Sequence, residues 1–126
     1  MDRPVIKMDP GSSDFDSPVN IGDASAILKC PQIYRGLMQG SPNEEITLTF
    51  PSAVDLIRGA PKLPIPGFVK RFSIRNDGRA VINLEPGEGG TTNGIMAVRA
   101  SPDAAHFALR YTSVTSSMES YQIIRE

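Results

Sequence analysis

Alternating apolar and polar positions along most of the chain predict short β-strands separated by turns. In the clearest run, residues 46–50, three apolar side chains would face a core and two threonines would face outward. Weaker versions of the pattern cover residues 68–74, 80–84, 95–99, 106–112 and 121–124. With the apolar-rich stretch that begins at Ile27, this gives about seven or eight strands at a spacing of roughly 8–12 residues. The pattern predicts an all-β fold: an antiparallel, jelly-roll-like β-sandwich.

Residues 52–59 depart from the strand pattern and predict one short helix. Ser52 is a suitable N-cap, and Asp55 follows three residues later, near the positive end of the helix dipole. Gly59 suits the C-terminal end, and Pro61 prevents continuation. Because fewer than two helical turns are unstable alone, we expect this helix to pack against a sheet or its end.

The segments between the predicted strands carry turn chemistry. Asn76-Asp77-Gly78 predicts a tight hairpin, from which residues 80–84 would return antiparallel to 68–74. Residues 62–67 contain two prolines and predict an extended connector, because residues before proline avoid the helical region. Residues 85–94 predict a glycine-rich loop, and residues 112–120 include a turn rich in serine and threonine.

The N-terminal segment differs from the rest, so we divide the chain into an extended arm, residues 1–26, and a β-sandwich domain, residues 27–126. Residues 8–18 are polar, turn-rich and aperiodic, and cannot bury enough apolar surface to offset their ordering entropy. The segment is therefore either a disordered tail or an arm that becomes ordered on a neighbouring subunit. The partner-binding residues of such an arm would be Val5, Ile6, Phe15, Val19 and Ile21.

Composition removes several classes of function. The chain has 126 residues, enough for one domain, and its 13 basic and 14 acidic side chains leave a net charge of -1. Proteins that bind the nucleic-acid backbone usually carry a basic excess, so we expect no nucleic-acid partner. The single cysteine predicts no disulfide framework, and one cysteine with one histidine is a poor basis for a zinc site. We expect no cofactor and no metal.

The hydropathy pattern predicts neither a membrane span nor a signal peptide. No run of 18 apolar residues occurs, and the N-terminus lacks a basic start followed by an apolar stretch. We therefore expect no membrane partner and no secretion, unless a larger assembly carries the chain out of the cell.

Several residue groups resemble parts of functional motifs, but each lacks the remainder. Residues 87–94 are glycine-rich without the Gly-Lys-Ser/Thr ending of a phosphate-binding loop, so a strand connection is the better interpretation. Asp14 and Asp16 lack the later ligands of a calcium loop. The pairs Glu44/Glu45 and Glu85/Glu88 could serve acid–base chemistry on sugars, but solvated turn charges are far commoner.

The remaining candidates have an ordinary structural interpretation beside the functional one. His106 is expected to point outward from its strand, and Cys30 to act as a small half-buried hydrophobe. Arg71, Arg75 and Arg79 form either a basic stripe for an acidic partner or a solvated sheet face. No nucleophile–base pair is recognisable from spacing, so we expect the chain not to be an enzyme.

A series of segments between Ile33 and Ile124 resembles β-rich virion proteins of large DNA viruses and tailed phages. The residues that carry this resemblance are 36–42, 46–53, 72–76, 81–90, 107–115 and 119–123. Their order matters most: a Thr-rich strand leads into Pro and a short helix, a strand ending in Asn precedes a Pro-Gly loop, and a later strand ends in Arg-Tyr-Thr. Residues 58–70 are richer in charge and proline than the pattern, and residues 1–26 lie outside it.

The resemblance implies a virion structural protein without catalytic residues. Its first form is a capsid decoration (cement) or minor capsid subunit, assembled in the host cytoplasm, that binds the major capsid protein and neighbouring virion subunits. Such domains are often homo-oligomers, with a trimer favoured. The alternative is a spike or fibre head that binds a host-surface glycan or protein through residues 87–94 and 112–120, because loops on a rigid sandwich commonly carry recognition.

Overall fold

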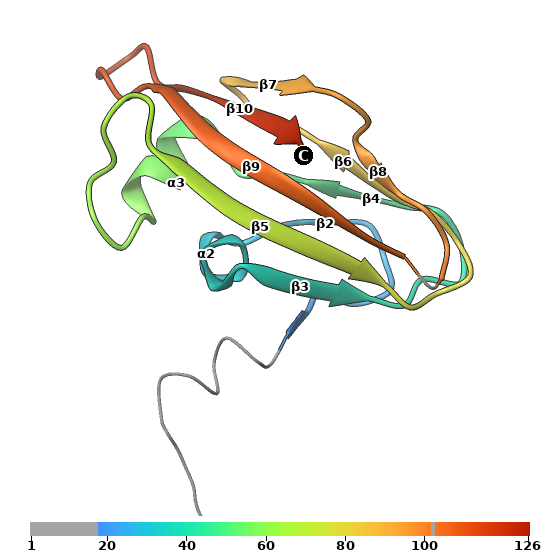
Figure 1. Ribbon diagram of the computed structural model, residues 1–126. Helices are drawn as coiled ribbons and strands as arrows, with labels where there is room; N and C mark the ends of the chain where they lie inside the picture. Colours follow the sequence, from blue (N-terminus) through green and yellow to red (C-terminus); the bar gives the residue numbers. More distant parts are fainter. Residues whose placement is uncertain (1–17, 102) are drawn as a thin grey trace, which may run out of the picture.

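A computed structural model describes residues 18–101 and 103–126, and shows two β-sheets packed face to face (Figure 1). The larger sheet has the strand order β1 (Val19–Asn20), β3 (Leu37–Gly40), β5 (Val69–Asn76), β9 (Asp103–Ser113), β10 (Ser120–Arg125) and β7 (Gly90–Asn93). The smaller sheet has the order β2 (Ala26–Ile27), β4 (Ile46–Thr49), β6 (Ile82–Glu85) and β8 (Ala97–Val98). Two helices, α2 (Cys30–Arg35) and α3 (Ala53–Arg58), lie at one end of the sandwich.

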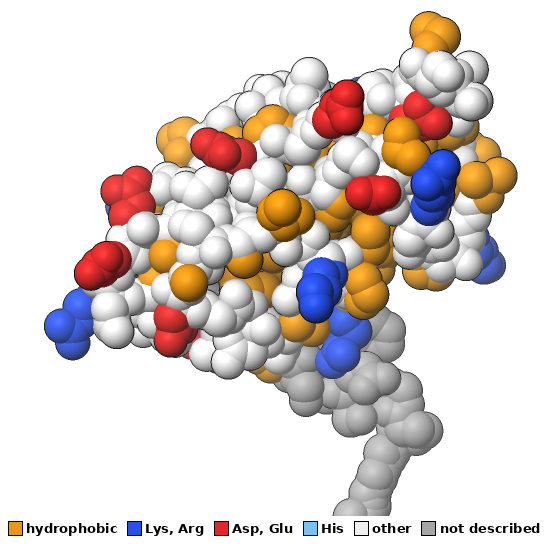
Figure 2. Space-filling model, turned by 180° about the vertical axis from the view of Figure 1, so that it is seen from behind, with side chains coloured by type: hydrophobic (Ala, Val, Ile, Leu, Met, Phe, Trp, Pro, Cys, Tyr) orange, Lys and Arg blue, Asp and Glu red, His pale blue; other side chains and the backbone are white. Residues whose placement is uncertain are grey.

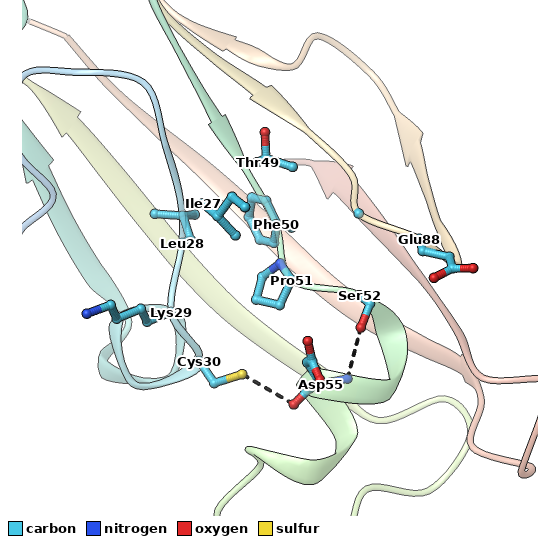
Figure 3. A pocket seen from close by; sticks show the side chains of 11 residues that line it. Ile27, Leu28, Lys29, Cys30, Thr49, Phe50, Pro51, Ser52, Asp55 and Glu88 are labelled. Atoms are coloured by element: carbon cyan, nitrogen blue, oxygen red, sulfur yellow. Dashed lines mark hydrogen bonds between the residues drawn. The ribbon is translucent and has the colours of Figure 1, made fainter.

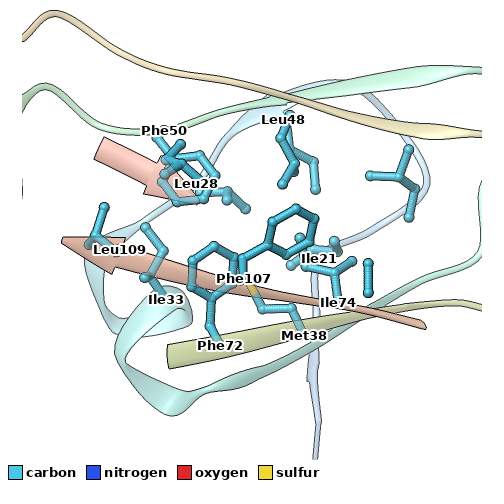
Figure 4. Packing of buried hydrophobic residues seen from close by; sticks show 14 of the residues in the cluster. Ile21, Leu28, Ile33, Met38, Leu48, Phe50, Phe72, Ile74, Phe107 and Leu109 are labelled. Carbon is cyan, nitrogen blue, oxygen red and sulfur yellow. The ribbon is translucent and has the colours of Figure 1, made fainter. Parts of the chain in front are cut away.

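Alternating side chains of the two sheets fill the space between them, as the sequence predicts. Ile46, Leu48 and Phe50 are buried on one side, and Phe107 is buried opposite them on the long central strand β9. The Phe107 and Phe72 rings stack with centroids 5.4 Å apart (Figure 4). This interleaving of two inner faces is how a sandwich hides its apolar surface.

The prediction of a purely antiparallel, all-β sandwich is wrong. Of the eight strand pairs among the described residues, five are parallel, including β3 with β5 and β4 with β6. The antiparallel pairs are β5 with β9, β9 with β10, and β6 with β8. Successive strands often cross from one sheet to the other instead of turning back, so strands of one sheet meet in parallel. The fold is therefore a mixed one, with two short helices and parallel as well as antiparallel strands.

The predicted hairpin at Asn76-Asp77-Gly78 is the clearest local case of this error. The strand pattern on both sides of the turn is real, but β5 belongs to the larger sheet and β6 to the smaller. The turn is thus a crossing between sheets. Gly78 lies against the backbone of Ser41 and Pro42, where an added Cβ would meet the Pro42 carbonyl oxygen at 2.3 Å.

Of the two helices, one was predicted from its capping residues and the other was not. The predicted helix is confirmed as α3: the Ser52 hydroxyl accepts a hydrogen bond from the Asp55 amide at 3.2 Å. Helix α2 was not predicted, because Ile33 and Tyr34 were assigned to a strand-like stretch. Its end is marked by Gly36, whose φ of 94° terminates the helix in the left-handed conformation before β3 begins.

The described part of the predicted arm joins the sheets of its own chain. Val19 lies in β1, where it pairs in parallel with Met38, and Ile21 is 8% exposed within the core. Val5, Ile6 and Phe15 lie outside the described residues. Within the described ranges, no helix is long and apolar enough to cross a membrane.

Candidate functional site

Exposed hydrophobic side chains gather at one end of the sandwich. We call this the helical end: α2, α3, residues 59–68 and the β9–β10 hairpin, residues 114–119. Leu63 and Ile65 are 80% and 68% exposed on the first loop, and Met118 is 68% exposed on the hairpin. The two loops lie at the same end because β5 and β9 pair antiparallel, with Val69 opposite Arg110 (Figure 1). A folded monomer rarely exposes neighbouring large apolar side chains without a role.

A groove of about 460 Å³ opens among these residues. Tyr34 of α2 lines it together with Pro61, Leu63 and Phe68 of the loop, and Lys62 and Lys70 add two positive charges. Figure 2 shows hydrophobic and basic side chains close together toward one edge of the molecule. The groove is therefore apolar with a cationic component, a combination suited to an apolar group that carries negative charge.

Backbone hydrogen bonds fix the loop that forms one wall of the groove. The Gly67 amide donates to the Tyr111 carbonyl at 2.7 Å, and the Tyr111 amide donates to the Phe68 carbonyl at 3.0 Å. Gly67 has a φ of 88°, which glycine adopts without a steric penalty. Its turn returns the chain to β5. Leu63 and Ile65, which precede the turn, project outside the core, whereas Pro64 between them is buried.

At the groove, two tyrosines share a partly buried polar contact. The hydroxyls of Tyr34 and Tyr111 hydrogen-bond to each other, and each lies 3.4 Å from the Leu56 carbonyl oxygen. Burial, and to a smaller extent the nearby Cys30 thiol, raises the pKa of Tyr34 to about 12. The contact ties α2 to α3 and to β9, and it holds Tyr34 in place as a groove wall.

Raising the pH from 10 to about 12 is expected to destabilise the fold through Tyr34. In the unfolded chain this tyrosine ionises near its ordinary pKa of 10, whereas the folded protein keeps the proton until about 12. The stability that Tyr34 contributes is therefore complete below pH 10 and is lost as the pH rises. Urea unfolding across this range should show a shallower decline in Tyr34→Phe than in the unaltered protein. Burial also raises the pKa of Tyr121, so some decline should remain. Equal slopes in both proteins would contradict the assignment to Tyr34.

A second hollow, of about 440 Å³, surrounds Cys30 between α2 and α3 (Figure 3). The Cys30 thiol donates to the Asp55 carbonyl oxygen at 3.4 Å. Burial, followed by the charge of Asp55, raises the pKa of this thiol. A protonated, half-buried thiol is a poor nucleophile, which agrees with its interpretation as a small hydrophobe.

The outer face of the larger sheet holds a contact that sequence reasoning missed. His106 is exposed, as expected, and its Nδ1 lies 2.6 Å from the Ser73 hydroxyl, because the two residues are register partners on β9 and β5. A spacing of 33 residues gave no signal of the pairing. Catalysis by such a pair needs an orienting group and oxyanion donors in a sheltered site. This pair lies on an open sheet face, away from both hollows.

The predicted basic stripe is largely paired with acidic groups. Arg71 meets the Glu126 carboxylate at 3.3 Å, and Arg75 meets the Asp77 carboxylate at 3.0 Å. Arg79 is exposed but follows the turn instead of continuing along β5. These contacts favour the interpretation of the three arginines as a solvated sheet face over their interpretation as a binding stripe for an acidic partner.

The two candidate carboxylate pairs, Glu44/Glu45 and Glu85/Glu88, lie at opposite ends of β4. Glu85 pairs with Thr49 at one end of β4, whereas Glu45 precedes the other end of that strand and accepts a hydrogen bond from Asn83 at 2.6 Å. Glu88 borders the hollow beside Cys30, whereas Glu44 and Glu45 border a different one. Asp14 and Asp16 lie outside the described residues. In the described part of the chain, no group of three or more His, Cys, Asp or Glu side chains could hold a metal.

The loop predicted from residue 85 to residue 94 contains a strand. Residues 90–93 form β7, which pairs in parallel with β10. The pairing brings Gly89 against Glu119, and the Tyr121 hydroxyl accepts from the Gly87 amide at 2.8 Å. The two loops assigned to recognition in the alternative hypothesis therefore adjoin each other.

Comparison of the chain with protein-family models, with curated proteins and with solved structures finds no match.

Proposed function

We propose that the chain is a virion structural protein, a capsid decoration (cement) or minor capsid subunit that docks through its helical end. The exposed apolar side chains of that end carry the proposal, and the sequence resemblance supplies the biological setting. Its partners would be the major capsid protein and neighbouring virion subunits, including further copies of the chain in a homo-oligomer.

The architecture suits a structural role. Two packed sheets form a rigid block, and the apolar loops lie at one end of it, where a partner surface can cover them without disturbing the core. Leu63, Ile65 and Met118 would lose their water contacts on docking, which is the main favourable term in association. A shell subunit that binds at one end can bridge neighbours and resist their separation.

The alternative role, a spike or fibre head, is favoured by one observation. Residues 87–89 and the hairpin after β9 lie side by side, because Gly89 packs against Glu119 and β7 pairs with β10. Their joint surface could bind a host-surface glycan or protein. Full occupancy across a shell would favour the cement role, whereas binding to a glycan array would favour the spike role.

Replacing Leu63 and Ile65 by aspartate is expected to reduce binding to particles by at least about tenfold, because charge at an interface core must be desolvated. Co-sedimentation of purified protein with particles lacking it would measure the loss. The matched control is Ile95→Asp, since Ile95 is 71% exposed but lies beside Arg125 at the far end of β10. Both proteins should keep the unfolding midpoint of the unaltered chain. Equal loss from both substitutions, or none from Leu63→Asp/Ile65→Asp, would contradict docking through the helical end.

A further inference from the structure

Two lysines bring positive charge to the groove of the helical end. Lys62 of the loop and Lys70 of β5 both line the groove. Within residues 18–101 and 103–126, the amine of neither lysine takes part in an ion pair or a hydrogen bond. Arg71 and Arg75, on the same strand as Lys70, each meet a carboxylate. The groove therefore holds two cations that an external anion could neutralise.

The Lys70 amine is held close to the protein surface. The residue is half-buried, and its amine lies 3.7 Å from where a Cβ on Gly36 would stand. Gly36 ends α2, so this amine lies between the helix that carries Tyr34 and the strand that carries Lys70 itself. An amine that is only partly surrounded by water gains more from a nearby anion than a fully solvated one, because the effective dielectric constant is lower.

The rest of the lining is largely apolar and preformed. Its larger members are Tyr34, Pro61, Leu63, Pro64, Ile65 and Phe68. The two prolines restrict the loop backbone, and the hydrogen bond from the Gly67 amide to the Tyr111 carbonyl, 2.7 Å long, fixes the end of the loop. The volume of about 460 Å³ falls within the range of small-molecule sites, roughly 300–1,000 Å³. Because these walls need little further ordering, a ligand binds at a smaller entropic cost.

Apolar walls beside two positive charges define the chemistry of the occupant. A neutral apolar molecule would cover the two amines without neutralising them, and a cation would be repelled. We propose that the groove binds a small amphipathic anion. Its apolar body lies among the aromatic and aliphatic walls, and Lys62 and Lys70 hold its acidic group. A lysine amine is a compact point charge, so the site accepts a carboxylate or a sulfonate without the planar geometry that arginine favours. This site goes beyond the proposed virion role and does not depend on it.

Two fluorescent probes that share their aromatic rings test the site on the purified, full-length protein. 1-Anilinonaphthalene-8-sulfonate carries a negative charge, and N-phenyl-1-naphthylamine does not. Lys62→Glu/Lys70→Glu should weaken binding of the sulfonate probe at least about tenfold, because charge-assisted contacts are lost, and should change binding of the uncharged probe less than about twofold. Phe68→Ala should weaken binding of both probes, since it removes an apolar wall that both contact.

Lys29→Glu/Arg79→Glu is the matched control, because it changes the net charge by the same amount outside the groove. Lys29 lines the Cys30 hollow, and Arg79 lies beyond the opposite end of β5. This variant should bind both probes as the unaltered protein does. An equal loss of the sulfonate probe in this control would overturn the proposal, since binding would then follow net charge or the other hollow.

A carboxylate competitor tests the same charge requirement with an aliphatic body. Decanoate should displace the sulfonate probe several-fold more effectively than decanol, which has the same chain without the charge. Circular dichroism should show the same unfolding midpoint for each variant. Equal displacement by decanoate and decanol, or a folded protein that does not bind the sulfonate probe, would overturn the small-molecule site. Neither result bears on docking to particles, which co-sedimentation measures separately.

Discussion

Phe107→Ala is expected to lower the free energy of unfolding by about 3–5 kcal/mol, the usual cost of deleting a buried aromatic ring. Phe107 is fully buried at the centre of β9, the strand that pairs with both β5 and β10. Its ring stacks on Phe72, and the Arg125 guanidinium lies 5.5 Å from its centroid. Removing the ring leaves a cavity between the sheets that the long, paired strands around it cannot close.

Urea unfolding followed by circular dichroism would measure the loss, with Phe68→Ala as the matched control. Phe68 is 45% exposed, so its truncation should cost less than about 1 kcal/mol. Phe107→Leu retains much of the volume and should fall between the two, which keeps the test informative if the alanine variant does not fold. Equal losses for Phe68→Ala and Phe107→Ala would contradict the assigned core.

Local patterns in the sequence were sufficient to predict most of the strands and the faces they bury. Alternation predicted the core-facing residues of β4 and β9, because each strand has one face on the core and one mainly toward water. Ala108, on the other face of β9, is nevertheless buried. Ser52 and Gly59 predicted α3, because capping depends on residues within one or two turns. These features are decided by neighbours in the sequence, so a single chain reveals them.

Pairing between strands could not be predicted in the same way. Alternation specifies which face of a strand is buried but not which strand lies beside it, so the parallel pair β4–β6 gave no signal. Strand β7, Gly90-Thr91-Thr92-Asn93, also carried no strand signal in the sequence, because its residues are polar or glycine and do not form an apolar face. Helix α2 did carry readable signals, Pro31 in its first turn and Gly36 at its end, but Ile33, Leu37 and Met38 fitted a strand equally well.

The groove at the helical end could not be predicted from the sequence, because the residues that line it come from three separate segments. Tyr34 comes from α2, Leu63 from the loop, and Lys70 from β5. A partial signal existed in Leu63 and Ile65, apolar residues in a proline-rich connector that no strand or helix pattern explained. Apolar residues without an element to bury them are candidates for an interface.

The crossing between sheets at the end of β5 depends on one buried amide. Asn76 is fully buried, and its Nδ2 donates to the carbonyls of Ala80 at 2.8 Å and Val98 at 3.2 Å. Its Oδ1 accepts from the Gly78 amide at 2.8 Å. One side chain thus satisfies three backbone groups from the turn and from β8. This explains why an Asn-Asp-Gly sequence, which favours a hairpin elsewhere, instead directs the chain into the second sheet.

Asn76→Ala is therefore expected to lower the free energy of unfolding by about 3 kcal/mol, because three buried backbone groups lose their partner at once. The matched control is Asn43→Ala, an exposed asparagine in the adjacent turn, which should change stability by less than about 0.5 kcal/mol. Hydrogen exchange of the Gly78 amide should accelerate in Asn76→Ala more than that of amides in β10, since the damage begins at the crossing. A loss no larger than that of Asn43→Ala would show that packing of the sheets alone, without this amide, determines where the chain crosses.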